Sequence, residues 1–170
     1  MLLFILLANS YVIKLSQEQY LALQLKKVKF YMQRNNDLFF IVKSWIRKAE
    51  NDLKNASNTI KMKDDCPTDT ICFHAQQCVE KYLKALLVLH GIDFPKTPEI
   101  KKLISLLSIP GRLDFSQEEQ IKLSYYATVT RYPGDYDEMT LAEAEQAVKI
   151  AKRVRNQIRK LLPKEVLKKV

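Results

Sequence analysis

The sequence predicts an all-α fold, an antiparallel up-and-down bundle of about five helices. Apolar residues recur at steps of three and four over long stretches, which is the period of one helix face. Capping boxes and Pro or Gly breakers separate these stretches. The 170 residues include only 3 Gly and 6 Pro, too few for the many turns of an all-β domain. With 47% apolar and 28% charged residues, the chain is globular rather than disordered.

The first two predicted helices cover residues 38–61 and 70–90. The first carries an apolar stripe at helical spacing, formed by Val42, Trp45, Ile46, Ala49, Leu53, Ala56 and Ile60. The second, capped by Thr68 or Asp69, is apolar on most sides, so we expect it at the centre of the bundle. Gly91 supplies the left-handed residue that ends it.

Three further helices follow in the predicted bundle. The Thr-Pro pair at residues 97–98 suits the cap and first turn of a third helix, which ends at the Pro-Gly pair 110–111. A capping box at residues 116–119 opens the fourth helix. A second capping box at residues 140–143 opens the last helix, which Pro163 ends.

The chain divides by pattern into an N-terminal extension of unknown role (residues 1–37), the helical bundle (residues 38–163) and a basic C-terminal tail (residues 164–170). The extension opens with eight apolar residues, too few to span a bilayer, and no Lys or Arg precedes them as in a secretory signal. We therefore expect no stable membrane insertion. Because Met32 precedes the well-patterned region, we expect the working domain to start near it, with residues 1–31 an extension or a misplaced start.

Charge and cysteine content narrow the function classes. Residues 149–170 hold nine Lys or Arg and one acid, whereas residues 40–148 are near neutral. Such a basic helix meets phosphate, an acidic lipid surface or an acidic partner, or it is only a solvated face. The cysteines, Cys66, Cys72 and Cys78, form no CxxC pair, and their odd count fits a reducing, cytoplasmic compartment. We expect no metal site and no cofactor.

The second predicted helix carries a polar stripe of His74, Gln77, Lys81 and Lys84, at steps of three, four and three. Because an unpaired buried charge is costly, we expect this stripe to face water, a partner or a cleft. It is either a plain exposed face of the bundle or a site that binds a nucleotide or phosphate. His74 can act as a base near neutral pH. A His74–Cys78 pair is a weaker alternative, since no third ligand accompanies it.

A second concentration of polar residues lies in the loop RYPGDYDE, residues 131–138. The Arg131 guanidinium suits phosphate or carboxylate, and Tyr132 can stack on a base or donate a hydrogen bond. Asp135 is a further candidate, as a polar ligand or an alternative base. The other interpretation is an inter-helix loop in which Arg131 ties down Asp135 or a helix C-terminus. The motifs GxGxxG, GxxxxGK[ST], HExxH and GxSxG are absent from the sequence.

Three blocks, in this order, resemble the HEPN (higher eukaryote and prokaryote nucleotide-binding) domain family, most closely its short stand-alone prokaryotic branch. They are WIRKAENDL at residues 45–53, FHAQQCVEKYLKA at residues 73–85 and RYP at residues 131–133, and the resemblance covers about residues 40–162. It implies a helical bundle that usually forms a homodimer. It also implies a small nucleotidyltransferase as partner in a toxin–antitoxin-like pair.

Many members of this family are metal-independent ribonucleases that use an Arg followed four to six residues later by a His. Here no His follows Arg131, so this motif is incomplete. The favoured hypothesis is therefore a nucleotide- or RNA-phosphate-binding module. Its binding residues are Lys81, Lys84, Gln77, Arg131, Tyr132 and Asp135. The alternative is a ribonuclease toxin with an atypical active site, in which Arg131 faces the phosphate and His74 is the base. A third hypothesis is a helical adaptor whose basic end touches an acidic partner.

Overall fold

The computed structural model describes residues 17–107, 113–129 and 138–168, which form six α-helices and one 3-10 helix. The chain divides into two compact units, Met1–Asp37 and Leu38–Val170. Helix α1 (Gln17–Thr59) starts in the first unit and supplies the first helix of the second. Within the first unit, large apolar side chains of α1 are exposed to solvent: Tyr20, Leu21, Leu23, Leu25, Val28, Phe30 and Met32.

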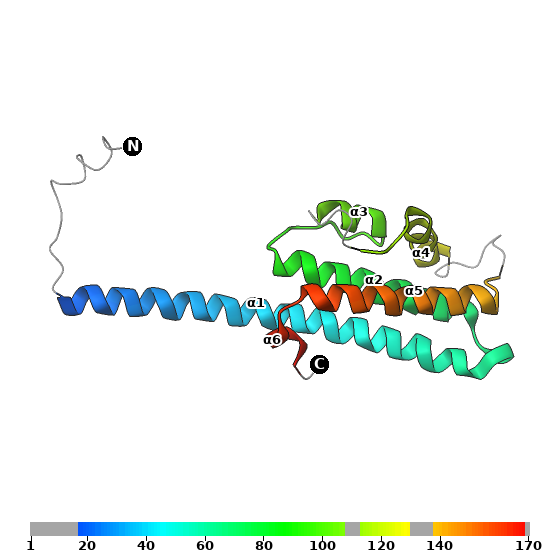
Figure 1. Ribbon diagram of the computed structural model, residues 1–170, viewed down its shortest axis with the longest axis horizontal. Helices are drawn as coiled ribbons and strands as arrows, with labels where there is room; N and C mark the ends of the chain where they lie inside the picture. Colours follow the sequence, from blue (N-terminus) through cyan, green and yellow to red (C-terminus); the bar gives the residue numbers. More distant parts are fainter. Residues whose placement is uncertain (1–16, 108–112, 130–137, 169–170) are drawn as a thin grey trace. The chain divides into compact units, whose positions relative to one another are not determined.

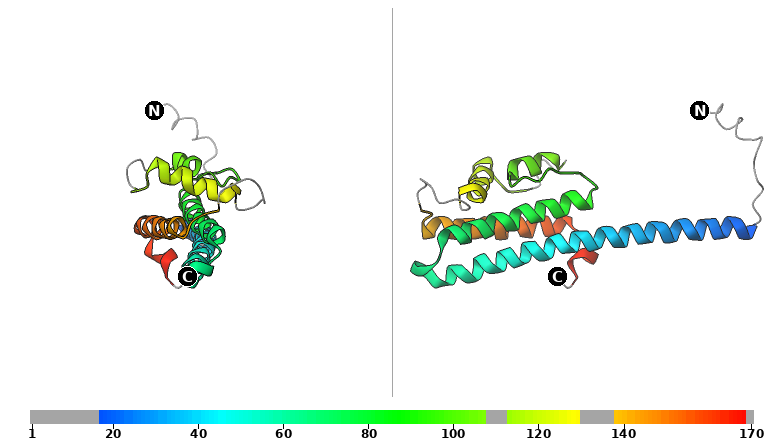
Figure 2. Two further views of the ribbon diagram at one scale, coloured as in Figure 1. Left: turned by 90° about the vertical axis from the view of Figure 1, so that its right-hand side faces the viewer. Right: turned by 180° about the vertical axis from the view of Figure 1, so that it is seen from behind.

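The second unit is a helical bundle around α2 (Thr68–Leu89) (Figures 1 and 2). The part of α1 from residue 38 onward and α5 (Leu141–Leu161) lie along α2. The shorter helices α3 (Ile100–Leu106) and α4 (Gln117–Val129) cover α2 on the side away from α1. Helix α1 runs opposite to α2, whereas α2 and α5 start at the same end because the segment with α3 and α4 returns the chain (Figure 1). The predicted all-α bundle is confirmed.

The core is built from the apolar faces that the sequence indicates. Thirteen of the 22 residues of α2 are buried, as expected for a central helix. The α1 stripe is buried at Val42, Ile46, Ala49, Leu53 and Ala56, while Trp45 and Ile60 are half-buried against the core. Helix α5 contributes Ala144, Ala147, Val148, Ile150, Ala151, Val154 and Ile158.

Three predicted helix ends are confirmed. Ser116 and Glu119 exchange hydrogen bonds at the start of α4, with Ser116 N donating to Glu119 Oε2 at 3.1 Å and Glu119 N donating to Ser116 Oγ at 3.2 Å. Thr140 forms the same capping box at the start of α5. Gly91 follows α2 with a φ of 66°, and its N–H donates to Val88 O while the next N–H reaches back to α2, which is a Schellman end.

Other predicted boundaries were wrong. Helix α1 begins at Gln17 rather than near residue 38, because residues 17–37 contain no Pro or Gly to break it. Helix α2 starts at Thr68 with no side-chain cap, which places Thr68 and Asp69 inside its first turn. Helix α3 starts two residues later than expected, because Pro98 is held outside it by a hydrogen bond from Gln76 Nε2 to its carbonyl, 3.2 Å long.

Two short helices were not predicted from the sequence. A short 3-10 helix, Ile60–Asp65, follows α1 and contains Lys63 with a φ of 56°. Residues 164–167, expected in the basic tail, form helix α6 (Lys164–Leu167), and Val166 is fully buried in the core. Among the described residues, no helix combines the length and the hydrophobicity that crossing a membrane requires.

Candidate functional site

The polar stripe of α2 is largely engaged in contacts inside the bundle, although His74 and Lys81 keep access to solvent. His74, Gln77 and Lys81 are half-buried, and Lys84 is 7% exposed. The expectation of a face turned to water, a partner or a cleft is therefore wrong for Lys84. Burial is tolerated because carboxylates on α1 and on α2 itself pair with these side chains.

Asp52 on α1 joins two of the stripe residues. It lies within the apolar stripe of that helix and is 8% exposed. Asp52 Oδ1 lies 3.0 Å from His74 Nδ1, and Oδ2 accepts a hydrogen bond from Lys81 Nζ. The side chains of His74 and Lys81 keep 24% and 19% of their surface accessible, so both reach solvent. We call Asp52, His74 and Lys81 the Asp52 site.

The geometry of the Asp52 site suits phosphate binding or proton transfer. The His74 tautomer that satisfies an ionised Asp52 carries its proton on Nδ1 and leaves the lone pair on Nε2. An imidazole oriented in this way by a carboxylate is the arrangement of a general base. The Lys81 ammonium next to it supplies positive charge for phosphate oxygens. The site can therefore contact a phosphate and take a proton from a hydroxyl group.

Glu80 organises a second, more deeply buried network on α2. Glu80 Oε1 accepts a hydrogen bond from Lys84 Nζ at 2.6 Å. Its Oε2 accepts from Gln76 Nε2 at 2.9 Å and from Gln77 Nε2 at 3.2 Å. Gln76 is fully buried and also binds the Pro98 carbonyl, so this network ties α2 to the segment before α3. We call Glu80, Lys84, Gln76 and Gln77 the Glu80 network.

Two aromatic rings enclose the amino group of Lys84. Lys84 Nζ lies 5.7 Å from the ring centroids of both Trp45 and Phe94. The two rings meet edge to face, with centroids 6.2 Å apart. Cation–π attraction and the Glu80 carboxylate together compensate the burial of this charge. The amino group of Lys84 is thus engaged inside the bundle.

A third polar cluster connects α1, α2 and α5 through Glu50. Glu50 Oε1 accepts hydrogen bonds from Arg155 Nε at 2.7 Å, from Arg159 Nη1 at 3.1 Å and from the Tyr82 hydroxyl. Burial raises the pKa of Glu50, but the hydrogen bonds from Arg155 and Tyr82 outweigh it and hold this pKa below its ordinary value. Burial and the nearby carboxylate raise the pKa of Tyr82. Glu50 therefore acts as an ionised anchor for α5.

The sequence match to known proteins covers all three clusters. Residues 42–161 match the model of the HEPN domain, which is more than half of the chain. The chain belongs to the HEPN domain family. A protein of Methanocaldococcus jannaschii named Putative toxin MJ1304 is 29% identical over 136 residues, which cover 71% of this chain and 87% of that protein. The crystal structure of ST0689, an archaeal HEPN homologue, is 28% identical with a TM-score of 0.53, and the match covers 71% of this chain and 96% of that chain.

Part of the predicted binding set of this HEPN domain belongs to the loop at residues 131–138. Arg131, Tyr132 and Asp135 lie outside the described residues. Their roles stay predictions from the sequence. The structure does describe His74 and Lys81, which it brings together at Asp52, and Gln77 and Lys84, which belong to the Glu80 network.

The thiols of the HEPN domain are poorly suited to chemistry. The three cysteines are free and buried. Burial raises the pKa of Cys72 to about 12 and also raises the pKa of Cys78. His74 contacts Asp52, so the predicted alternative of a His74–Cys78 pair finds no support. Within the described ranges, no group of three or more His, Cys, Asp and Glu is arranged to hold a metal ion.

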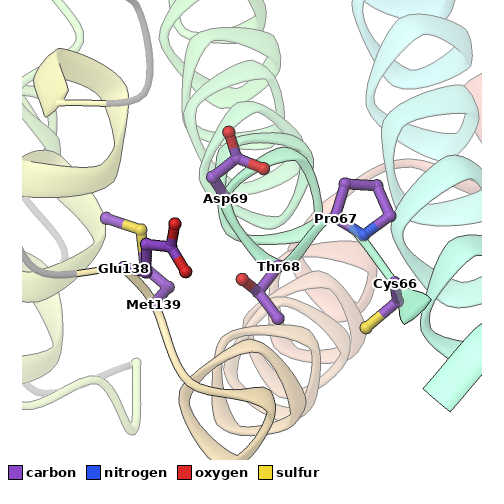
Figure 3. Close-up of a pocket in the computed structure, with 6 residues that line it drawn as sticks. All are labelled: Cys66, Pro67, Thr68, Asp69, Glu138 and Met139. Carbon is purple, nitrogen blue, oxygen red and sulfur yellow. The ribbon is translucent and has the colours of Figure 1, made fainter. Parts of the chain in front are cut away.

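Two pockets of the HEPN domain lie apart from the Asp52 site. The first, about 270 Å³, is lined by the residues around the start of α2 and those just before α5 (Figure 3): Cys66, Pro67, Thr68, Asp69, Glu138 and Met139. The second, about 240 Å³, lies along α1 and is lined by Phe40, Ile41, Ser44, Trp45 and Lys48. Of the predicted site residues that the structure describes, none lines either pocket.

Sequence reasoning missed the acidic residues that organise these clusters. Asp52 stands between Ala49 and Ala56 in the buried stripe of α1, and a carboxylate at such a position requires a cationic partner. That interruption of an apolar stripe was a usable signal. Glu80 stands four residues before Lys84 on one helix face, which was a second signal. No local signal pointed to Glu50, because its arginine partners lie on α5.

Proposed function

We propose that this chain is the toxin-like HEPN component of a two-component system and binds a nucleotide or an RNA phosphate at the Asp52 site. One observation carries the proposal: a single buried carboxylate holds an imidazole and an ammonium group side by side, and both remain accessible to solvent. Membership of the HEPN family supports it, as does the name of the Methanocaldococcus jannaschii relative, Putative toxin MJ1304.

In this proposal Lys81 is the principal phosphate ligand. Its ammonium has one carboxylate partner and keeps 19% of the side-chain surface accessible, which leaves room for a phosphate oxygen. Arg131, Tyr132 and Asp135 complete the binding set, as their side-chain chemistry predicts. Lys84 and Gln77 follow along α2, but Lys84 has to leave Glu80 before it can bind a ligand. Lys81 therefore gives the sharper test.

The proposal includes a homodimer, a small nucleotidyltransferase partner and a cytoplasmic location. The family resemblance supports the first two, and three free cysteines are compatible with a reducing compartment. A tagged pull-down from the native cell tests the pairing. Recovery of a small nucleotidyltransferase in stoichiometric amount is the expected result, and recovery of RNA without a protein partner contradicts the pairing.

A binding titration tests the Asp52 site. The full chain is titrated with labelled ATP and with a labelled oligouridylate at low salt, where phosphate contacts are strongest. Lys81→Gln is expected to weaken binding at least tenfold, which corresponds to about 1.4 kcal/mol. Lys54→Gln is the matched control, because Lys54 is an exposed lysine of α1. If Lys81→Gln and the control bind with equal affinity, the proposal that the Asp52 site binds phosphate is wrong.

The pairing of His74 with Asp52 favours a second candidate function, a metal-independent ribonuclease with an atypical active site. An imidazole held by a carboxylate can take the proton of a ribose 2′-hydroxyl. The test is cleavage of labelled RNA in the presence of EDTA. If the wild-type chain cleaves and His74→Gln binds the same RNA without cleaving it, the ribonuclease function is established. If the wild-type chain binds RNA without cleavage, the binding module stands.

A further inference from the structure

On helix α5 the arginines and the lysines have different surroundings. Its three arginines are paired: Arg153 with Glu119 at 2.6 Å, and Arg155 and Arg159 with Glu50. Its three lysines, by contrast, are exposed and form no ion pair with any described residue. They are Lys149, Lys152 and Lys160. The arginines hold the bundle together, whereas no ion pair within the described part of the chain explains the position of the lysines.

The three lysines share one face of α5. Together with exposed Asn156 they follow steps of three, four and four along the helix. Lys149 and Lys160 lie about 17 Å apart along the helix axis, given the rise of about 1.5 Å per residue. Figure 1 shows α5 on the near side of the bundle. In the opposite view, Figure 2 (right), α5 lies on the far side, behind α2. We call Lys149, Lys152 and Lys160 the lysine stripe.

We propose that the lysine stripe binds the phosphate backbone of a nucleic-acid strand, as a second contact surface separate from the Asp52 site. The stripe is several times longer than the rise of one nucleotide, about 3.4 Å along one strand of a duplex. A mononucleotide therefore spans only part of the stripe, whereas an oligonucleotide can meet all three lysines. This inference goes beyond the proposed function, which requires only one phosphate at the Asp52 site.

The composition of this face favours a polyphosphate over a protein or a membrane. The exposed residues of α5 contain no large apolar or aromatic side chain: they are Ala142, Glu145, Gln146, Lys149, Lys152, Asn156 and Lys160. Protein interfaces are enriched in aromatic residues and depleted in Lys. A helix that lies on a membrane inserts its apolar face, and the apolar face of α5 is buried in the core. Charge without apolar surface is the chemistry that suits a phosphate backbone.

The same composition implies binding without base readout. Lysine ammonium groups act as point charges toward phosphate, and the face offers no planar fork or aromatic ring for a base. Affinity should then depend steeply on salt, because each neutralised phosphate releases counterions. Glu145 is the only acidic residue in the exposed set of α5, and it stands one turn before Lys149.

A pair of charge-matched triple variants tests the proposal. Lys149→Gln, Lys152→Gln and Lys160→Gln remove the stripe. The control variant carries Lys54→Gln, Lys101→Gln and Lys102→Gln, which replace three other exposed lysines of the same unit. It lowers the net charge of the chain by the same amount as the stripe variant. Binding of a fluorescein-labelled oligouridylate of about 20 nucleotides is measured by anisotropy between about 50 and 200 mM KCl. The stripe triple is expected to lower the slope of log K against log salt by about two, since each phosphate contact on a single strand contributes about 0.7.

The outcomes separate this proposal from the Asp52 site. The control triple should keep a slope close to that of the wild type, and the stripe triple should keep its affinity for ATP. Equal changes of slope in both triples would show that net charge alone acts, and would overturn the proposal. So would a wild-type chain that does not bind the oligouridylate at 50 mM KCl. If Lys81→Gln abolishes oligouridylate binding while the stripe triple leaves the slope intact, the Asp52 site stands and the lysine stripe fails.

Discussion

Loss of Glu80 alone should destabilise the bundle strongly, whereas joint loss of Glu80 and Lys84 should not. The two side chains keep 10% and 9% of their surface accessible, and Lys84 Nζ lies 2.6 Å from Glu80 Oε1. Glu80→Leu leaves the Lys84 ammonium inside the bundle without a carboxylate. It also removes one acceptor from Gln76, which is fully buried.

The expected magnitudes follow from these contacts. Removal of one partner of a buried ion pair costs about 3–5 kcal/mol, and we expect the lower end because both groups retain some solvent contact. The lost acceptor of Gln76 adds about 1 kcal/mol. The double variant Glu80→Leu, Lys84→Met removes both charges and fills the space with apolar atoms, so it should lie within about 1–2 kcal/mol of the wild type. The coupling energy of this pair is then about 2 kcal/mol or more.

Urea unfolding followed by far-UV circular dichroism measures these free energies. Lys122→Met is the control, since it breaks the ion pair between Lys122 and Glu143, whose side chains are exposed to 43% and 37%, respectively. That pair should contribute less than about 1 kcal/mol. A cost below about 1 kcal/mol for Glu80→Leu, or a double variant as unstable as the single one, would refute the reasoning. Lys84 would then be available as a phosphate ligand.

Three further predictions concern pH, thiol reactivity and backbone strain. Because the pKa of Glu50 is lowered in the folded chain, its contribution to stability is fully present above its unfolded pKa, about 4.5, and is lost as pH falls through the folded value. Glu50→Gln should therefore flatten the fall of the urea midpoint at acid pH, and an unchanged fall would contradict the pairing with Arg155 and Arg159. At pH 8 a thiol-specific reagent should label Cys72 only after unfolding in urea, since burial raises its pKa to about 12; rapid labelling of Cys72 in the folded chain would contradict this. Gly91→Ala should cost about 1–2 kcal/mol through its φ of 66° alone, because no atom lies within 4 Å of an added Cβ; an unchanged midpoint of unfolding would show that the turn relaxes.

The predictable parts of this fold depend on residues close together in the chain. The capping boxes at Ser116 and Thr140 operate within four residues, and the Schellman end at Gly91 requires only the last turn of α2. The start of α1 was missed because continuous helix formers carry no boundary signal when apolar periodicity is weak. The start of α3 was missed because Gln76, far along the chain, holds Pro98.

The candidate site divides in the same way. That His74, Gln77, Lys81 and Lys84 share one face of a helix follows from their spacing in the sequence. The meeting of Lys81 and His74 at Asp52, and the enclosure of Lys84 by Glu80 and two rings, depend on how the helices pack in space. Asp52 is 22 residues from His74, and Glu50 is 109 residues from Arg159. Partners so distant are chosen by helix packing, because the cost of burying a charge is met by whichever opposite charge the neighbouring helix brings within reach.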